Sequence, residues 1–265
     1  MRDNGFLASV QGSVARLFVA TFGVAGMTWA LIVFPVFSSE MSIVSVANAV
    51  AVGEVFNPSI LTAIDQKLEN DSGWNVRSSI LSKATIIRLR QAEEAIAARD
   101  PARIDQSLKS LAKILNAALA ESPNDSFLWL TRFWLKNFVN GWRPDNMQNL
   151  KMSYDMGRNE GWIAIKRNRL AISYHLVMEP DLAELATAEF VNLVRWGFVR
   201  EAAEIASGPG RSVRNTLFPR LKDLNIDRRR PFAQALYKQD LDDVLVPGIA
   251  PLSPQIPMPI LPPGY

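Results

Sequence analysis

Apolar residues recur along much of this chain with the period of an α-helix. The clearest stretch lies in the middle of the chain and places its apolar side chains on one helical face: Ile104, Leu108, Leu111, Ala112, Leu115, Ala118 and Leu119. Asp100 and Pro101 precede this stretch, and a capping residue followed by proline is typical of a helix start. We therefore predict a helix that begins at Pro101.

Further stretches with helical periodicity lie on both sides of this one. They cover 80–95, 127–139, 145–157, 162–176, 182–193, 199–206, 213–224 and 231–239. The link between 80–95 and the helix at Pro101 is short, so these two helices are expected to form an antiparallel hairpin. The chain shows no convincing alternation typical of strands, so residues 57–243 are predicted to form an all-α domain.

A long uncharged segment precedes this domain. Residues 17–39 contain no charged side chain, and about 20 apolar residues suffice for a helix that crosses a membrane. The sequence therefore predicts one transmembrane helix at 17–39. Cleavage as a signal peptide after Ala47-Asn48-Ala49 is the alternative, but the apolar region exceeds the roughly 7–15 residues usual for such peptides.

Flanking charges predict the orientation of this span. Arg2 and Arg16 precede it, and Glu40 is the first charge after it. Positive residues tend to stay in the cytoplasm, so residues 1–16 are expected there, with the later domain on the periplasmic or extracytoplasmic side, as in a bacterial inner-membrane protein. The apolar segment at 40–56 is too short to cross by itself, and either prolongs the helix or lies at the interface.

The C-terminal segment 244–265 has a different composition. It contains seven prolines, at 247, 251, 254, 257, 259, 262 and 263. Such a segment is expected to be extended or disordered. The Pro-x-x-Pro spacings at 251–254 and 254–257 suit recognition by aromatic grooves, and a plain solvated tail or spacer is the alternative.

Aromatic residues concentrate in the predicted helix at 127–139. The block contains Phe127, Trp129, Phe133, Trp134, Phe138 and Trp142. A helix that is apolar over most of its circumference is normally buried between others, so most of these side chains are expected in the core. Any that are exposed would instead indicate a platform for a protein partner or a glycan.

The serial helical hairpins resemble tetratricopeptide repeats. Ala118, Pro123 and Trp129 fit that repeat's small residue, closing proline and opening tryptophan, and Trp129, Trp162 and Trp196 are 33 and 34 residues apart. The resemblance is degenerate, since Arg132-Phe133 stands where the repeat prefers leucine and glycine, and Trp196 is expected to end its helix. It covers roughly 80–206, and it implies stacked helix pairs with a concave surface suited to a peptide or protein.

No catalytic constellation is visible in the sequence. Cysteine is absent, and the single histidine, His175, is two residues from Ser173, so on a helix the two side chains would point apart. Neither a phosphate-binding glycine loop nor a metal-ligand spacing is present. We therefore expect no enzyme activity, no metal and no cofactor.

Carboxylates form the remaining enzyme alternative. A carboxylate-based envelope enzyme would draw on pairs among Glu93, Glu94, Glu160, Glu179, Glu184 and Glu189. Sequence spacing does not show any two of them facing each other across a cleft. Solvated helix faces explain the same residues.

Two basic clusters are the candidate binding residues. The first contains Lys166, Arg167 and Arg169, and the second contains Arg211, Arg214, Arg228, Arg229 and Arg230. They could hold an acidic glycan or a lipid head group, and a solvated charged face is the alternative. The net charge of the whole chain is only +3, which does not suggest nucleic-acid binding.

These patterns favour a protein-interaction or scaffold module on the outer side of a membrane. The expected partners are another envelope protein, in envelope or polysaccharide assembly, and the membrane through residues 17–39. An anion- or glycan-binding domain and a carboxylate-based envelope enzyme are the alternatives.

Overall fold

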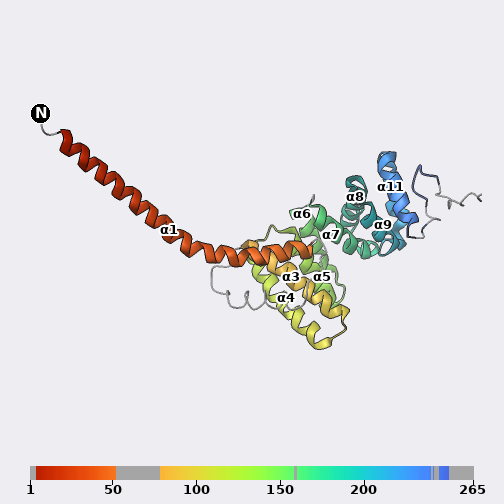
Figure 1. Cartoon of the computed structure of the whole chain (residues 1–265). Coiled ribbons are helices and arrows are strands. Elements are labelled where there is room, and N and C mark those ends of the chain that lie inside the picture. The colour runs from red at the N-terminus through yellow and green to blue at the C-terminus, as the bar shows by residue number, and fades with distance from the viewer. Residues whose placement is uncertain (1–3, 52–77, 158–159, 240, 242–244, 251–265) are drawn as a thin grey trace, which may run out of the picture. The chain divides into compact units, whose positions relative to one another are not determined.

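The computed structural model describes residues 4–51, 78–157, 160–239, 241 and 245–250 (Figure 1). Throughout these ranges every regular element is a helix, with no strand, in agreement with the expected all-α class. Most of the Pro-rich segment and residues 52–77 lie outside the described ranges. The chain divides into two compact units, Met1–Ser107 and Leu108–Tyr265.

The first unit is built on the packing of two helices. These are α1 (Asn4–Ala51) and α3 (Ser78–Ala97). Ile43 and Ala47 of α1 and Ala84 and Ile87 of α3 are buried, and α3 makes its most extensive contacts with α1. The expected antiparallel hairpin between 80–95 and the helix that begins at Pro101 is therefore not the main packing of α3.

The prediction of a transmembrane helix at 17–39 is wrong by this structure. Nowhere in the described ranges does a helix offer a run of the length and apolarity that a membrane crossing requires. Residues 17–39 lie within α1, which runs on to Ala51 and buries Ile43 and Ala47. Of the two alternatives for 40–56, prolongation of the helix is the one seen, as far as Ala51. The expected location and orientation of the chain are not tested and stay predictions.

The second unit begins within α4 (Pro101–Glu121), whose first residue is the predicted proline. A series of helices follows α4. They are α5 (Ser126–Asn140), η1 (Pro144–Asn146), α6 (Met147–Met156), α7 (Gly161–Ser173), η2 (His175–Val177), α8 (Pro180–Trp196), α9 (Val199–Ser207), η3 (Arg211–Val213), α10 (Arg214–Leu217), η4 (Phe218–Asp223) and α11 (Ile226–Tyr237). Trp196 ends its helix as expected. The predicted helix at 213–224 is instead divided into short α and 3-10 turns, with Pro219 in the last of them.

Neighbouring helices in this unit pack as pairs. The most extensive contacts join α5 with α6, α7 with α8, and α9 with α11, and contacts of α8 with α9 link two of these pairs. Local chemistry sets the ends: Asp125 accepts hydrogen bonds from the first backbone N–H groups of α5, and Gly197, at φ 92°, closes α8. The core between α8 and α11 contains the contacting rings of Phe190, Phe218 and Phe232.

Candidate functional site

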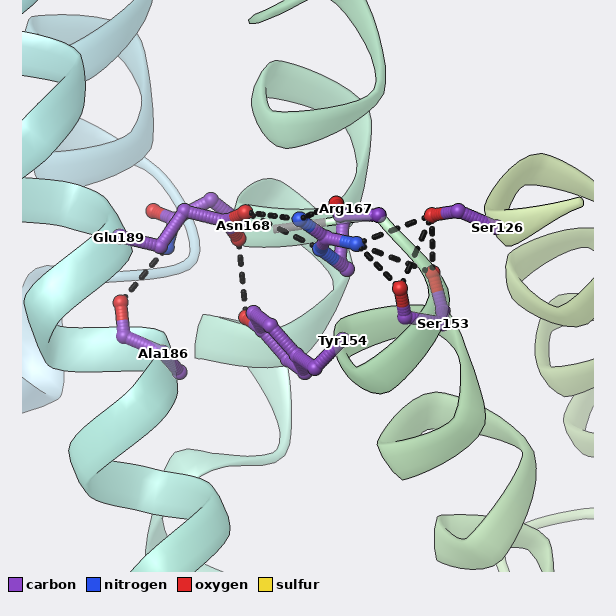
Figure 2. Close-up of polar contacts among 8 residues, drawn as sticks. Ser126, Ser153, Tyr154, Arg167, Asn168, Ala186 and Glu189 are labelled. Carbon is purple, nitrogen blue, oxygen red and sulfur yellow. Dashed lines mark hydrogen bonds and ion pairs between the residues drawn. The ribbon is translucent and has the colours of Figure 1, made fainter. Parts of the chain in front are cut away.

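A cluster of buried polar side chains lies among helices α5, α6, α7 and α8 (Figure 2). Its centre is the fully buried Arg167 of α7, which forms an ion pair with Glu189 of α8, whose side chain is only 5% exposed. Ser126 at the start of α5 and Ser153 and Tyr154 of α6 complete the buried polar cluster. Four helices therefore meet at one guanidinium group.

All three nitrogens of the Arg167 guanidinium are used. Nε and Nη2 donate to Glu189 Oε1 at 3.0 and 2.6 Å. Nη1 donates to the backbone oxygen of Ser153 at 2.6 Å and to Ser126 Oγ at 3.1 Å, and Nη2 also donates to the oxygen of Gly157 at 2.8 Å. The charge is thus compensated by a carboxylate and two carbonyl oxygens, as a buried arginine requires.

The carboxylate of Glu189 is held by a second donor. Tyr154 donates its hydroxyl to Glu189 Oε2 at 2.9 Å, and its ring lies 4.3 Å from the Arg167 guanidinium carbon. Burial raises the pKa of Glu189 above its usual range, and the bonds from Arg167 and Tyr154 oppose that rise. Burial and the negative charge of Glu189 raise the pKa of Tyr154 well above 10.0, so the phenol remains a donor.

Two further residues fit closely around the buried polar cluster. A Cβ atom at Gly157 would lie 2.5 Å from Ser126 Cβ, so a side chain there would displace the serine. Asn168 donates to the oxygen of Ala186 in α8 at 2.7 Å, which adds a second polar tie between α7 and α8. Because the cluster is buried, its hydrogen bonds and its ion pair stabilise the packing of the four helices.

The sequence analysis predicted Arg167 as a binding residue for an anion and gave Glu189 as a candidate carboxylate of an enzyme. The structure directs them at each other inside the core. Arg167 is spaced four residues from Ile163 and from Ala171, on the buried face of α7. Glu189 is spaced seven residues from Leu182 and four from Leu193, on the buried face of α8. A charged residue on an apolar helix face is therefore the signal that could have indicated their burial, although not their pairing.

The remaining basic candidates of the first group lie around α7. Lys166 is half-buried, and Arg169 is exposed, with its Nη1 3.9 Å from a carboxylate oxygen of Glu204 in α9.

The residues of the second basic group differ in exposure and in their contacts. Arg211 is exposed, and Arg214 donates through Nε to the oxygen of Ala206 at 2.8 Å. Arg229 donates to the oxygen of Pro247, so it holds the chain that follows α11. Arg228 and Arg230 are exposed on α11.

The other candidate carboxylates and the histidine take part in local contacts. Glu184 pairs with Arg220, and Glu94 pairs with Arg90 at 2.9 Å. His175 begins η2, with its Nε2 3.0 Å from Thr187 Oγ1. In the ranges that the structure describes, no group of three or more potential ligand side chains could hold a metal ion.

A set of exposed apolar side chains marks the C-terminal end of α5. Phe138 is 44% exposed, Val139 57% and Trp142 44%, and Trp134 stacks on Phe138 with ring centroids 5.4 Å apart. Phe127 and Phe133 of the same helix are buried, whereas Trp129 and Trp134 are partly exposed. The expectation that most of the aromatic block lies in the core is therefore met only by the two buried phenylalanines. We call Trp134, Phe138, Val139 and Trp142 the α5 aromatic surface.

The loop that carries Trp142 is pinned to α5 by buried amides. Asn146 donates to the side-chain oxygen of Asn137 at 3.0 Å, and Asn137 donates to the oxygen of Phe133 at 2.9 Å. Gly141 begins the loop at φ 71° and ψ 177°, a conformation that is almost confined to glycine. The aromatic surface is therefore supported by a fixed turn.

Comparisons with protein-family models, with curated proteins and with solved structures find no match to this chain. The class of protein is thus defined by its own structure, as an all-α protein whose second unit is a series of helix pairs.

Proposed function

We propose that the chain is a protein-interaction module whose α5 aromatic surface binds a partner protein. The observation that carries the proposal is the exposure of Phe138, Val139 and Trp142 at and just after the end of α5, where Phe138 also stacks on Trp134. Large aromatic side chains are enriched among the residues that dominate binding energy at interfaces. Leaving them in water at the end of one helix costs hydrophobic free energy, which a partner would recover.

Two further features support this role. The loop of Trp142 is held by Asn137 and Asn146, so the surface is preorganised and little entropy is lost on binding. The helix pairs of the second unit are compatible with the predicted repeat-like architecture, in which stacked helix pairs would present a binding surface. An assembly role in a cell envelope remains the predicted setting.

Co-purification of the full-length chain from its native cells tests the proposal. The variant combining Phe138→Ala and Trp142→Ala should recover at least tenfold less of a stoichiometric partner, since one strong aromatic contact contributes about 2 kcal/mol and about 1.4 kcal/mol is tenfold. The matched control combines Leu176→Ala and Val177→Ala, which are also exposed and apolar but lie on η2. Equal loss in both variants, or none in either, would contradict the proposed surface.

Anion or glycan binding is the second candidate function. The exposed Arg228 and Arg230 lie on one short stretch of α11, and closely spaced exposed guanidinium groups attract anions. Because Arg229 holds Pro247, the informative variant replaces Arg228 and Arg230 by alanine and keeps Arg229. Binding of a sulfated glycan that falls with added salt and with this variant would support the candidate; binding unchanged by both would remove it.

A further inference from the structure

The chain after α11 is fixed to the second unit by a small built anchor. Val246 is only 3% exposed, and Arg229 donates to the oxygen of Pro247. Ile249 N–H donates to the oxygen of Val246 at 3.0 Å, and Gly248 has φ 71°. This is a β-turn with proline and glycine at its two central positions, as a type II turn prefers. Residue 251 therefore starts from a fixed point on the unit.

The segment that leaves this anchor has a distinctive chemistry. Residues 251–265 contain no Asp, Glu, Lys or Arg, and they combine six prolines with Leu252, Ile256, Met258, Ile260 and Leu261. Proline-rich segments with Pro-x-x-Pro spacing bind aromatic-lined surfaces, because a chain already restricted to the polyproline conformation loses little entropy on docking. The ligand chemistry that suits this segment is thus an exposed group of aromatic rings.

The same unit carries such a group at the end of α5. Trp134, Phe138 and Trp142 supply rings, and Val139 extends the apolar area. At about 3.1 Å per residue, an extended segment of about 15 residues spans on the order of 45 Å. A folded unit of about 150 residues has a radius of gyration of about 15 Å, so the segment is long enough to reach a surface of its own unit.

We propose that residues 251–265 dock on the α5 aromatic surface of their own chain and cover it until a partner displaces them. The inference rests on the proposed function, because it assigns a resident occupant to the same surface. Docking in the same chain is favoured over docking on a second copy, because the anchor at Val246 and Pro247 keeps the segment at a high local concentration. The segment thereby lowers the affinity of any competing partner.

Spin labelling of the full-length chain tests this docking. The chain contains no cysteine, so a nitroxide on Gln255→Cys reports on the segment alone. We expect a broadened electron paramagnetic resonance spectrum that does not change on dilution or on addition of unlabelled chain. Adding Phe138→Ala and Trp142→Ala should convert it to a sharp spectrum, whereas Leu176→Ala with Val177→Ala should leave it broad. Pro254→Ser with Pro257→Ser should also sharpen it.

Three results would overturn the inference. A sharp spectrum in the parent chain shows that the segment is undocked, and a broad spectrum insensitive to the Phe138 and Trp142 changes places it elsewhere. Broadening that disappears when unlabelled chain is in excess or on dilution identifies a second copy as the acceptor. None of these results bears on whether a partner protein binds the α5 aromatic surface, which co-purification measures. Failure of the docking and failure of the proposed function are therefore distinguishable.

Discussion

Replacing Arg167 by methionine should strongly destabilise the second unit. The substitution keeps much of the side-chain volume. It removes the ion pair between Arg167 and Glu189, so the buried carboxylate keeps the hydrogen bond from Tyr154 but loses its charged partner. Removing one partner of a buried ion pair costs about 3–5 kcal/mol, because the other charge stays desolvated. The carbonyl oxygens of Ser153 and Gly157 also lose their bonds to Nη1 and Nη2, at about 1–3 kcal/mol for each buried unsatisfied group.

The loss should be partly reversed by removing the stranded carboxylate. In the double variant Arg167→Met with Glu189→Met, the unpaired charge is gone and only the carbonyl and phenol groups lack partners. We expect this variant to be about 3 kcal/mol more stable than Arg167→Met alone. Both should remain less stable than the parent chain.

Urea unfolding of the full-length variants measures these differences. Tryptophan fluorescence is a suitable signal, since the ring of Trp162 contacts that of Phe127 at 5.2 Å between centroids, and Phe127 follows Ser126 of the buried polar cluster. A destabilisation by Arg167→Met below about 1 kcal/mol would show that the guanidinium is not the buried centre described above. A double variant as unstable as the sum of its single changes would refute the charge-pairing argument.

Two other predictions follow from the same geometry. Gly141→Ala should lower the free energy of unfolding by about 1–3 kcal/mol, because φ of 71° and ψ of 177° strain a residue with a Cβ atom. It should also weaken partner binding, because it moves Trp142. Denaturation midpoints and co-purification measure the two effects, and Gly26→Ala in α1 is the control for the loss of a glycine. The raised pKa of Glu189 should make stability depend on pH: the folded state holds the proton more tightly than the unfolded chain, so the contribution of Glu189 is largest below the ordinary carboxyl value of 4.5 and declines as the pH rises through the raised pKa. Urea midpoints from pH 4 to 8 should show this slope in the parent chain and lose that part of it in Glu189→Gln; identical slopes in both would contradict the assignment.

Much of the helical framework could be predicted from the sequence because it depends on local patterns. The period of apolar residues, the proline at 101 and the glycine at 197 fix where helices run and end. The stretch at 213–224 was predicted less well, since its apolar spacing suits a helix whereas the structure breaks it into short turns around Pro219.

The long-range contacts could not be predicted in this way. Arg167 and Glu189 are neighbours only after α7 packs on α8. Each lies on the apolar face of its helix, which indicates burial but does not identify the partner. The aromatic block at 127–142 was recognised, but the division between buried Phe133 and exposed Phe138 depends on which face of α5 meets α6 and α7. The predicted span at 17–39 was inferred from the length and the missing charge of one segment, and such a local pattern does not show that α1 continues to Ala51 and packs on α3.

Photo-crosslinking at the α5 aromatic surface tests the central claim most directly. A photoreactive phenylalanine analogue at Val139 of the full-length chain, in its native cells, should yield one discrete adduct whose mass includes a second protein; the same group at the exposed Lys151 of α6 should not. An adduct without added mass would report the chain's own segment and not a partner. If Val139 yields no intermolecular adduct beyond that seen at Lys151, the α5 aromatic surface is not a partner-binding site.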